Sequence, residues 1–149
     1  MIAPDIESYL VFHQRYRKDG RLSLRKPVRL MLENGKEIFV SGYTGDKTVA
    51  VTANGSTRGS SFSVFDCDDG DLDVLVGHGG PAVRLFENIG IYGKPLFRYT
   101  GRPSFLTEHP GGHYRIVEPC DFDGDGRFEV ITGTDFGSVL YFRRRPKHK

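Results

Sequence analysis

The sequence predicts an all-β fold in which about two related four-stranded antiparallel units follow a remnant strand of a third unit. Three observations lead to this prediction. Two acidic loops each run into a β-rich segment, and their residues align at a nearly constant offset along the chain. The 149 residues include 19 glycines and 8 prolines, which mark many turns. Between these turns the runs are rich in β-branched and aromatic residues and show no helical period.

The clearer acidic loop lies at residues 121–129, where four carboxylates alternate with other residues and glycines interrupt them. Its acids are Asp121, Asp123, Asp125 and Glu129. Unpaired anions at such spacing repel by roughly 1 kcal/mol per close pair even near solvent. A hard dication removes that cost, and Ca²⁺ takes oxygen ligands of this kind. The segment therefore predicts a calcium loop that leads into a strand.

Two other structures are possible for this loop. An EF-hand needs a bidentate Glu at position twelve and a helix on each side. Position twelve counted from Asp121 is Thr132, which lies in a β-rich run, so the sequence argues against an EF-hand. A plain acidic turn on the surface is the remaining alternative.

The second acidic loop lies upstream and is one residue shorter. Its residues 69–77 align with 125–133 at an offset of 56, and the offset falls to 55 ahead of the loop, where Gly124 has no counterpart. Its candidate ligands are Asp66, Asp68, Asp69, Asp71 and Asp73. Because the missing residue changes their spacing, the sequence leaves calcium binding and an acidic turn equally open for this loop.

The pattern Asp-x-Asp-x-Asp-Gly-x-x-Glu, followed by an apolar strand that ends in glycine and by a second strand, resembles the FG-GAP/VCBS repeat. That repeat forms the blades of integrin-α-like β-propellers and occurs in many secreted glycan-associated proteins. The resemblance covers residues 62–90 and 114–144 well and 26–61 loosely. It implies these Ca²⁺ ligands: the side chains of Asp121, Asp123, Asp125 and Glu129 and the carbonyl of Arg127. It also implies an extracellular location.

Predicted boundaries follow these units. They are 1–25 for an N-terminal segment with the outer strand of a preceding blade, 26–90 for the first blade, 91–144 for the second and 145–149 for a basic tail. The expected strands are 28–32, 38–40 or 49–52, 62–65, 72–76 and 82–87 in the first blade, and 96–99, 114–118, 127–132 and 138–143 in the second. Two blades and a remnant do not close a ring, because propellers use about four to eight blades. We therefore expect a piece of a longer protein, with assembly of several copies or a small open stack as alternatives.

Charge and hydropathy limit the partners. The net charge is +2, but five of the 21 basic residues lie in the last seven positions, and the other residues carry 16 basic and 19 acidic side chains. No basic stripe interleaved with aromatics is expected elsewhere, so nucleic-acid binding is disfavoured. No apolar stretch reaches the length of a membrane span. Residues 1–7 carry acids and lack the apolar core of a signal peptide.

We expect a calcium-stabilised binding or interaction module for a glycan or a protein, with the remaining blades or other copies as further partners. One alternative is a fragment of a carbohydrate-active enzyme such as a polysaccharide lyase. Its candidate basic residues are His109, His113 and Arg115, although their spacing singles out none of them. The other alternative is a self-assembling structural repeat protein. The sequence contains no nucleophile elbow, phosphate loop or dinucleotide fingerprint, so binding is favoured over catalysis.

Overall fold

The computed structural model describes residues 1–4, 9–39, 61–67, 69–77, 83–101, 114–134 and 136–143. Within these ranges the chain forms strands and turns and no helix, which confirms the predicted all-β class for this part of the protein. None of the described residues therefore belongs to a helix long and apolar enough to cross a membrane. The strands are β1 (Ile2–Pro4), β2 (Leu10–Phe12), β3 (Arg15–Lys18), β4 (Arg21–Leu24), β5 (Val28–Arg29), β6 (Met31–Leu32), β7 (Ser61–Phe65), β8 (Asp73–Gly77), β9 (Arg84–Asn88), β10 (Leu96–Gly101), β11 (Tyr114–Cys120), β12 (Glu129–Thr134) and β13 (Val139–Phe142).

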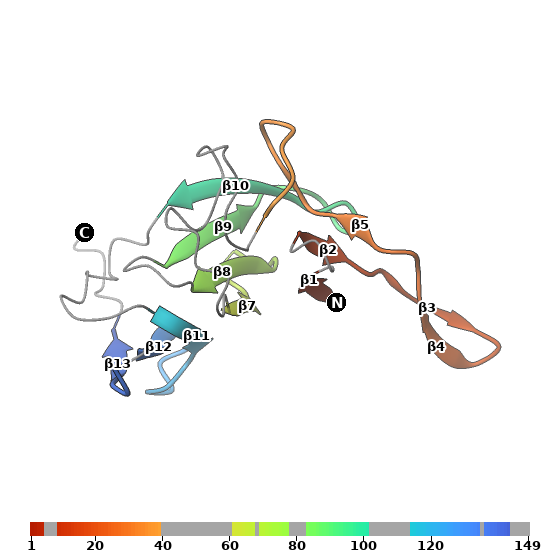
Figure 1. Cartoon of the computed structure of the whole chain (residues 1–149). Helices are drawn as coiled ribbons and strands as arrows, with labels where there is room; N and C mark the ends of the chain where they lie inside the picture. Colours follow the sequence, from red (N-terminus) through yellow and green to blue (C-terminus); the bar gives the residue numbers. More distant parts are fainter. Residues whose placement is uncertain are drawn as a thin grey trace.

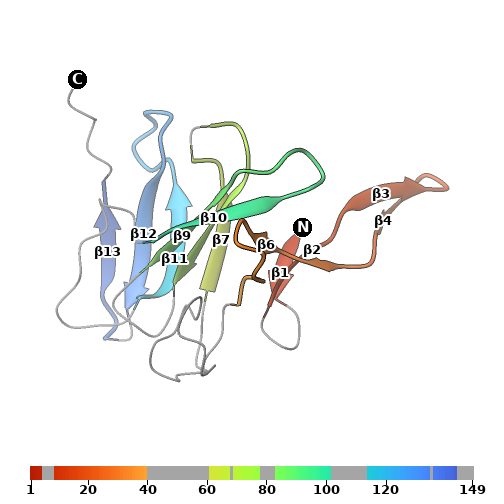
Figure 2. The ribbon, with the colours of Figure 1, turned by 90° about the horizontal axis from the view of Figure 1, so that it is seen from above.

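The described strands are arranged as small sheets that follow one another along the molecule (Figure 1). A five-stranded sheet in the order β6-β10-β9-β8-β7 lies between an N-terminal sheet, β1-β2-β5, and a C-terminal sheet, β11-β12-β13. Strands β3 and β4 form a separate hairpin that extends away from these sheets (Figure 2). All pairs are antiparallel except β6 with β10, which is parallel.

Strand β8 explains why the five-stranded sheet is the middle layer. Successive side chains of a strand point to opposite faces. Val74 and Val76 pack in a core cluster with residues of the N-terminal sheet, whereas Leu75 packs in a second cluster with residues of the C-terminal sheet. All three side chains are fully buried, and each such burial stabilises the fold by about 1.5–3 kcal/mol. The middle sheet is therefore covered on both faces.

Side-chain contacts join the middle sheet to the C-terminal sheet. The hydroxyl oxygen of Ser63 lies 2.6 Å from the carbonyl oxygen of Val117, and the Val117 N–H donates to the Ser61 hydroxyl over 3.2 Å. The rings of Phe65 and Phe128 meet edge to face with centroids 4.6 Å apart. Neighbouring edge strands β7 and β11 are thus linked through side chains rather than through a backbone ladder.

The strand pairs around the two acidic loops have matching registers. Phe65 lies opposite Asp73 in the β7–β8 pair, and Cys120 lies opposite Glu129 in the β11–β12 pair. These positions differ by 55 residues before the loop and 56 after it, which are the offsets found in the sequence. The β8–β9 and β12–β13 registers are likewise related by 56. Residues that align in the sequence therefore occupy equivalent pairing positions.

Strand β10 does not lie where the sequence analysis expected it. The segment 96–99 was expected in the second blade, but β10 pairs with β9 and completes a four-stranded antiparallel meander, β7-β8-β9-β10. The cause is a tight turn in which Gly93 has a φ of +79°, and the Asn88 side chain accepts N–H groups of Gly90 and Leu96. A side chain at Gly90 would meet the Lys94 carbonyl oxygen, so only glycine fits there. The chain therefore returns at once to the strand it has just left.

A turn at Asn34-Gly35 follows β6, with Gly35 at a φ of +79° and the Leu32 N–H donated to the Lys36 carbonyl over 2.7 Å. The alternative strand at 49–52, and residue 40 at the end of 38–40, lie outside the described residues. Ile38 itself is fully buried and donates its N–H to Leu30 over 3.0 Å.

Candidate metal centres in the two acidic loops

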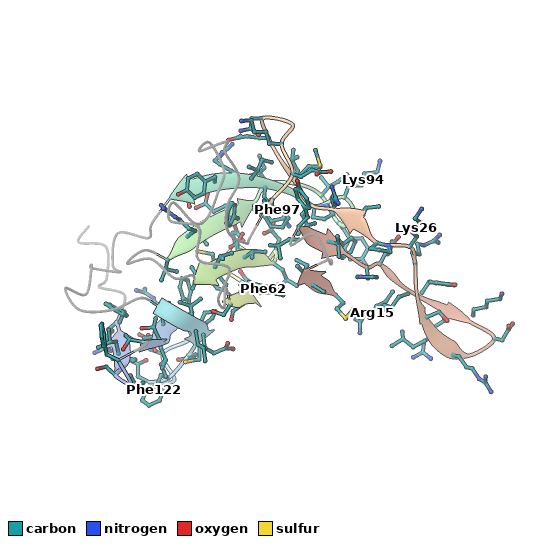
Figure 3. All side chains as sticks on the ribbon, viewed as in Figure 1. Arg15, Lys26, Phe62, Lys94, Phe97 and Phe122 are labelled. Atoms are coloured by element: carbon teal, nitrogen blue, oxygen red, sulfur yellow. The ribbon has the colours of Figure 1, made fainter. Side chains whose placement is uncertain are left out.

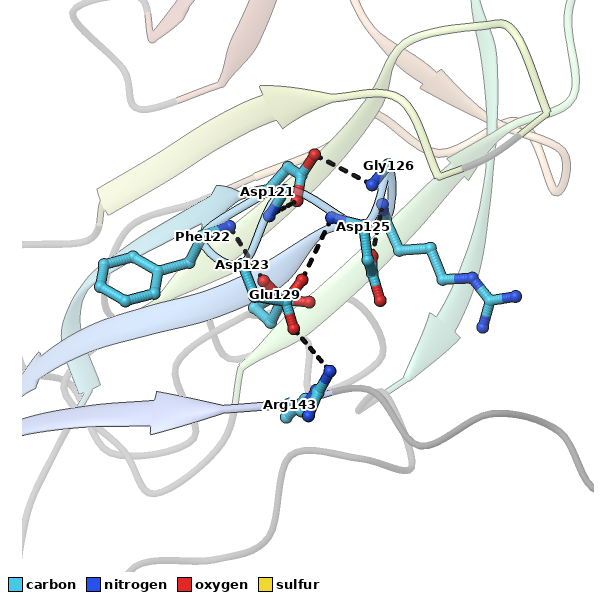
Figure 4. A network of polar contacts seen from close by, with 9 residues as sticks. Asp121, Phe122, Asp123, Asp125, Gly126, Glu129 and Arg143 are labelled. Carbon is cyan, nitrogen blue, oxygen red and sulfur yellow. Dashed lines mark hydrogen bonds and ion pairs between the residues drawn. The ribbon is translucent and has the colours of Figure 1, made fainter.

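The second acidic loop wraps around the carboxylate of Asp121 (Figure 4). One Asp121 oxygen accepts the Gly124 N–H over 2.8 Å, and the other accepts the Gly126 N–H over 3.0 Å. Both glycines have positive φ, +76° and +83°, a conformation that residues with a Cβ rarely adopt. The two glycines therefore allow the backbone to close around the first carboxylate of the loop.

Three of the predicted ligands of this loop lie together. Carboxylate oxygens of Asp121, Asp123 and Glu129 lie within 4.8 Å of one another. Oxygens that bind one Ca²⁺ at about 2.3–2.6 Å lie at most about 5 Å apart, so this spacing suits a single calcium ion. Glu129 is only 1% exposed and accepts the Phe122 N–H over 2.9 Å, which fixes its position at the start of β12. The donor set, all carboxylate oxygen, fits Ca²⁺.

Asp125, another predicted ligand, is not part of this carboxylate group. The Asp125 carboxylate accepts the Arg127 N–H over 2.9 Å, and the Asp125 N–H itself donates to Asp123 over 3.2 Å. Arg143, which the sequence analysis did not select, forms an ion pair of 2.6 Å with Asp123. The Arg143 side chain is 65% exposed, and an ion pair so open to solvent contributes about 0–1 kcal/mol. A cation that binds this cluster therefore competes only with the weak ion pair between Arg143 and Asp123.

The first acidic loop has a similar capping carboxylate but a different carboxylate group. Asp66, the counterpart of Asp121, accepts the N–H groups of Asp69 and Gly70, each over 3.0 Å. Gly70 has a φ of +91°. Asp66 thus caps the loop rather than joining its carboxylate group. Asp68 lies outside the described residues.

Asp69, Asp71 and Asp73 form the carboxylate group of this loop, with oxygens within 4.8 Å of one another. Asp73 is fully buried at the start of β8, and its Oδ1 accepts the Asn88 N–H over 2.7 Å. Its Oδ2, and Oδ1 of Asp71, are buried without a hydrogen-bond partner among the described residues. A buried polar atom without a partner costs about 1–3 kcal/mol, and more when it is charged. A cation between these oxygens removes that cost, so the residues present fit a bound Ca²⁺.

The electrostatics of Asp73 agree with this geometry. The pKa of Asp73 is raised from 3.8 to about 6, mainly by burial and also by the nearby Asp69 and Asp71 charges, while the backbone N–H groups of Asn88 and Cys67 oppose the rise. Burial also raises the pKa of Asp71, together with the charges of Asp69 and Asp66. Burial and like charges thus oppose ionisation of these two acids, and a bound cation would offset both effects.

A cavity of about 530 Å³ adjoins the first loop, and its walls are mainly apolar. Leu72 and Phe12 line it together with Tyr92. Leu72 is 57% exposed, whereas Phe128, its counterpart 56 residues later, is 8% exposed and packs on Phe65. Phe128 thus fills the contact between the middle and C-terminal sheets, whereas the equivalent side chain, Leu72, leaves a cavity on the N-terminal side.

The residues considered for catalysis add no site to the described part of the chain. His109 and His113 lie outside the described residues, and Arg115 lies in β11. The two carboxylate clusters are therefore the candidate functional centres among the residues that the structure describes.

No family model matches the chain, and no solved structure matches it. The chain is similar to cartilage acidic protein 1 of Mus musculus, with 32% identity over 84 residues. The aligned part covers 56% of this chain and 12% of that relative, so the chain spans about an eighth of the relative's length. The comparison is thus a local similarity to one part of a much longer protein.

Proposed function

We propose that this chain is a calcium-stabilised β-repeat module of the FG-GAP/VCBS type, which presents loops and turns to a glycan or protein ligand. The observation that carries the proposal is a buried acid at an equivalent position in each carboxylate cluster. Asp73 in one cluster and Glu129 in the other stand at the first position of a central strand, beside two further carboxylates of the loop. A buried ionised carboxylate is costly unless it has a positive partner.

The role of calcium in this proposal is structural. Asp121, Asp123 and Glu129 would hold one ion, and Asp69, Asp71 and Asp73 would hold the other. A bound ion supplies positive charge that joins exposed loop acids to a buried acid on a strand. The loop is then tied to the start of β8 or β12, and the neighbouring strands pair in a fixed register. Loop ordering of this kind prepares a binding surface without any chemical step.

The arrangement of sheets supports a further part of the proposal. Three sheets follow one another and share apolar contacts on successive faces, as neighbouring blades of a larger propeller do. The similarity to a much longer relative agrees with a module that works beside other blades. The name of that relative links it to cartilage, and an extracellular location is part of the proposal for this chain.

Thermal unfolding tests the calcium proposal. Wild-type protein is melted in EDTA and in millimolar CaCl₂, together with Asp123→Asn and with Asp19→Asn as the matched control outside both loops. Calcium at a hundredfold excess over its Kd stabilises the folded state by about 2.7 kcal/mol. We expect this rise in the wild type and in Asp19→Asn, and a smaller rise in Asp123→Asn. The same melting temperature with and without calcium in a cooperatively folded wild type would refute the proposal.

A further inference from the structure

The β3–β4 hairpin is the most basic part of the described chain. Residues 15–26 contain six basic side chains and one acid, Asp19. Outside this segment and the last seven residues, the chain carries ten basic and eighteen acidic side chains, a net charge of −8. The expectation that positive charge gathers only in the tail is therefore incomplete. The hairpin is a positive arm on an otherwise acidic body.

The turn of this hairpin is well formed although the strands bury little surface. Asp19 and Gly20 have φ values of +52° and +75°, the left-handed pair that a two-residue hairpin turn needs. Strands β3 and β4 pair fully from Arg15 opposite Leu24 to Lys18 opposite Arg21. Almost every side chain on the two strands is exposed. The hairpin is thus held by its own turn and ladder and extends into solvent (Figures 2 and 3).

The charges of the hairpin have no acidic partners in the described chain. Arg25 lies over the Tyr16 ring at 5.3 Å, and Arg17 bonds the Gly20 carbonyl over 3.3 Å. No ion pair joins the cations of the hairpin to a carboxylate of the described residues. Lys18 stands directly opposite Arg21, and like charges at such positions destabilise a strand pair. An isolated two-stranded hairpin is only marginally stable, so an anionic partner that offsets this repulsion would stabilise it.

We propose that the β3–β4 hairpin binds an acidic polysaccharide chain that carries sulfate or carboxylate groups. One face combines Arg15 and Arg17 with Leu22 and Leu24, which are 62% and 43% exposed. Such a polymer offers anions for the guanidinium groups and apolar C–H surfaces of sugar rings for the leucines. The inference rests on the proposed binding function and names its ligand class.

Charge complementarity favours this polymer over a nucleic acid. A two-stranded ribbon can enter the major groove of DNA. A DNA duplex, however, is wide and densely charged, so the acidic body of the chain would repel it. Phosphate backbones also give no apolar surface to the two exposed leucines. A single polysaccharide chain can contact the arm alone.

Binding to immobilised heparin, a sulfated polysaccharide, tests this inference with the full 149-residue chain. The measurement uses surface plasmon resonance at about 0.15 M salt. The double variant Arg15→Gln, Arg17→Gln removes the two cations of the proposed binding face. The matched control, Lys147→Gln with Lys149→Gln, removes the same charge from the tail. We expect the hairpin variant to weaken Kd about tenfold and the tail variant to change it less than about twofold.

Several results would overturn the inference. They are absent heparin binding by the wild type, equal losses in the hairpin and tail variants, and equal affinity for a short DNA duplex. A wild-type dimer in light scattering that the hairpin variant breaks would also overturn it, because the arm would then be an interface between copies. A cooperative melting transition of each variant confirms that it folds. The calcium-dependent rise in melting temperature separates the two proposals, because it persists if only the hairpin inference fails and vanishes if the calcium proposal fails.

Discussion

Asp73 and Glu129 are buried acids at the same position of two equivalent loops. Each is the first residue of its strand, β8 or β12, and their exposed fractions are 0% and 1%. Each accepts a backbone N–H, from Asn88 at 2.7 Å and from Phe122 at 2.9 Å. Neither has a basic side chain bonded to it among the described contacts. Backbone N–H groups thus hold both carboxylates in place, and no described basic side chain neutralises their negative charge.

Replacing Asp73 by Asn should have opposite effects with and without calcium. In EDTA at neutral pH the variant removes a buried charge whose pKa is raised to about 6, so we expect it to be more stable than the wild type by up to roughly 3 kcal/mol. In calcium the same variant loses a ligand and should lose most of the gain from the first loop. Urea denaturation in both buffers measures these differences. The matched control is Asp19→Asn, which changes an exposed acid outside both loops and should matter little in either buffer. Destabilisation of Asp73→Asn in EDTA would show that the buried charge already has a partner.

The pH dependence of stability should also depend on calcium. Between pH 3.8 and about 6 the folded state keeps a proton on Asp73 that the unfolded state releases. The contribution of Asp73 to the free energy of unfolding is therefore complete below pH 3.8 and is lost as pH rises through about 6 in EDTA. In calcium the slope should reverse, because binding needs the ionised carboxylate. The difference between wild type and Asp73→Asn, measured by denaturation at several pH values, isolates this contribution. A difference that stays constant across this range in EDTA would contradict the burial argument.

Phe128 should be the most important side chain between the middle and C-terminal sheets. Its ring is 8% exposed and packs edge to face on Phe65 at 4.6 Å. Phe128→Ala should cost about 3–5 kcal/mol, as other deletions of buried rings do. Phe136→Ala removes a ring that is 74% exposed and should change stability by less than about 0.5 kcal/mol. Chemical denaturation compares the two, and equal losses would argue against a packed contact between these sheets.

Gly126 should be needed for its backbone conformation rather than for space. Its φ is +83°, and no atom lies within 4 Å of the position that a Cβ would take, so Gly126→Ala introduces strain without a clash. The strain is about 1–2 kcal/mol and opens the loop that surrounds Asp121. Gly133→Ala adds the same methyl group to open space at an ordinary strand position and is the matched control. We expect Gly126→Ala to lower both stability and calcium affinity and Gly133→Ala to lower neither. Unchanged calcium affinity in Gly126→Ala would show that the loop does not shape the site.

Sequence patterns predicted the local elements better than their pairing. The segments 62–65, 72–76 and 138–143 correspond within one or two residues to β7, β8 and β13, because turn residues and apolar alternation mark their ends. The partner of β10 was mispredicted, because unit boundaries were drawn by loop alignment and the turn at Gly93 was not recognised. A sequence does not state which neighbour an isolated strand will join.

The periodicity of apolar residues does not reveal three other features of the structure. The β3–β4 hairpin was missed because its strands alternate charged and exposed residues, although Asp19-Gly20 is a hairpin turn signal. For the first loop the sequence named Asp66 and Asp69 alike as ligands, and only the structure separates the capping Asp66 from the clustered group. The unpaired oxygen of Asp73 depends on burial by distant strands, which local sequence does not reveal.

Calcium stoichiometry tests the central claim most directly. Isothermal titration calorimetry on metal-free protein should show two bound ions per chain, one for each carboxylate cluster. Asp73→Asn and Asp121→Asn should each remove one ion and leave the other. A wild type that shows no saturable calcium binding at millimolar concentration would contradict the account, and both loops would then be acidic turns.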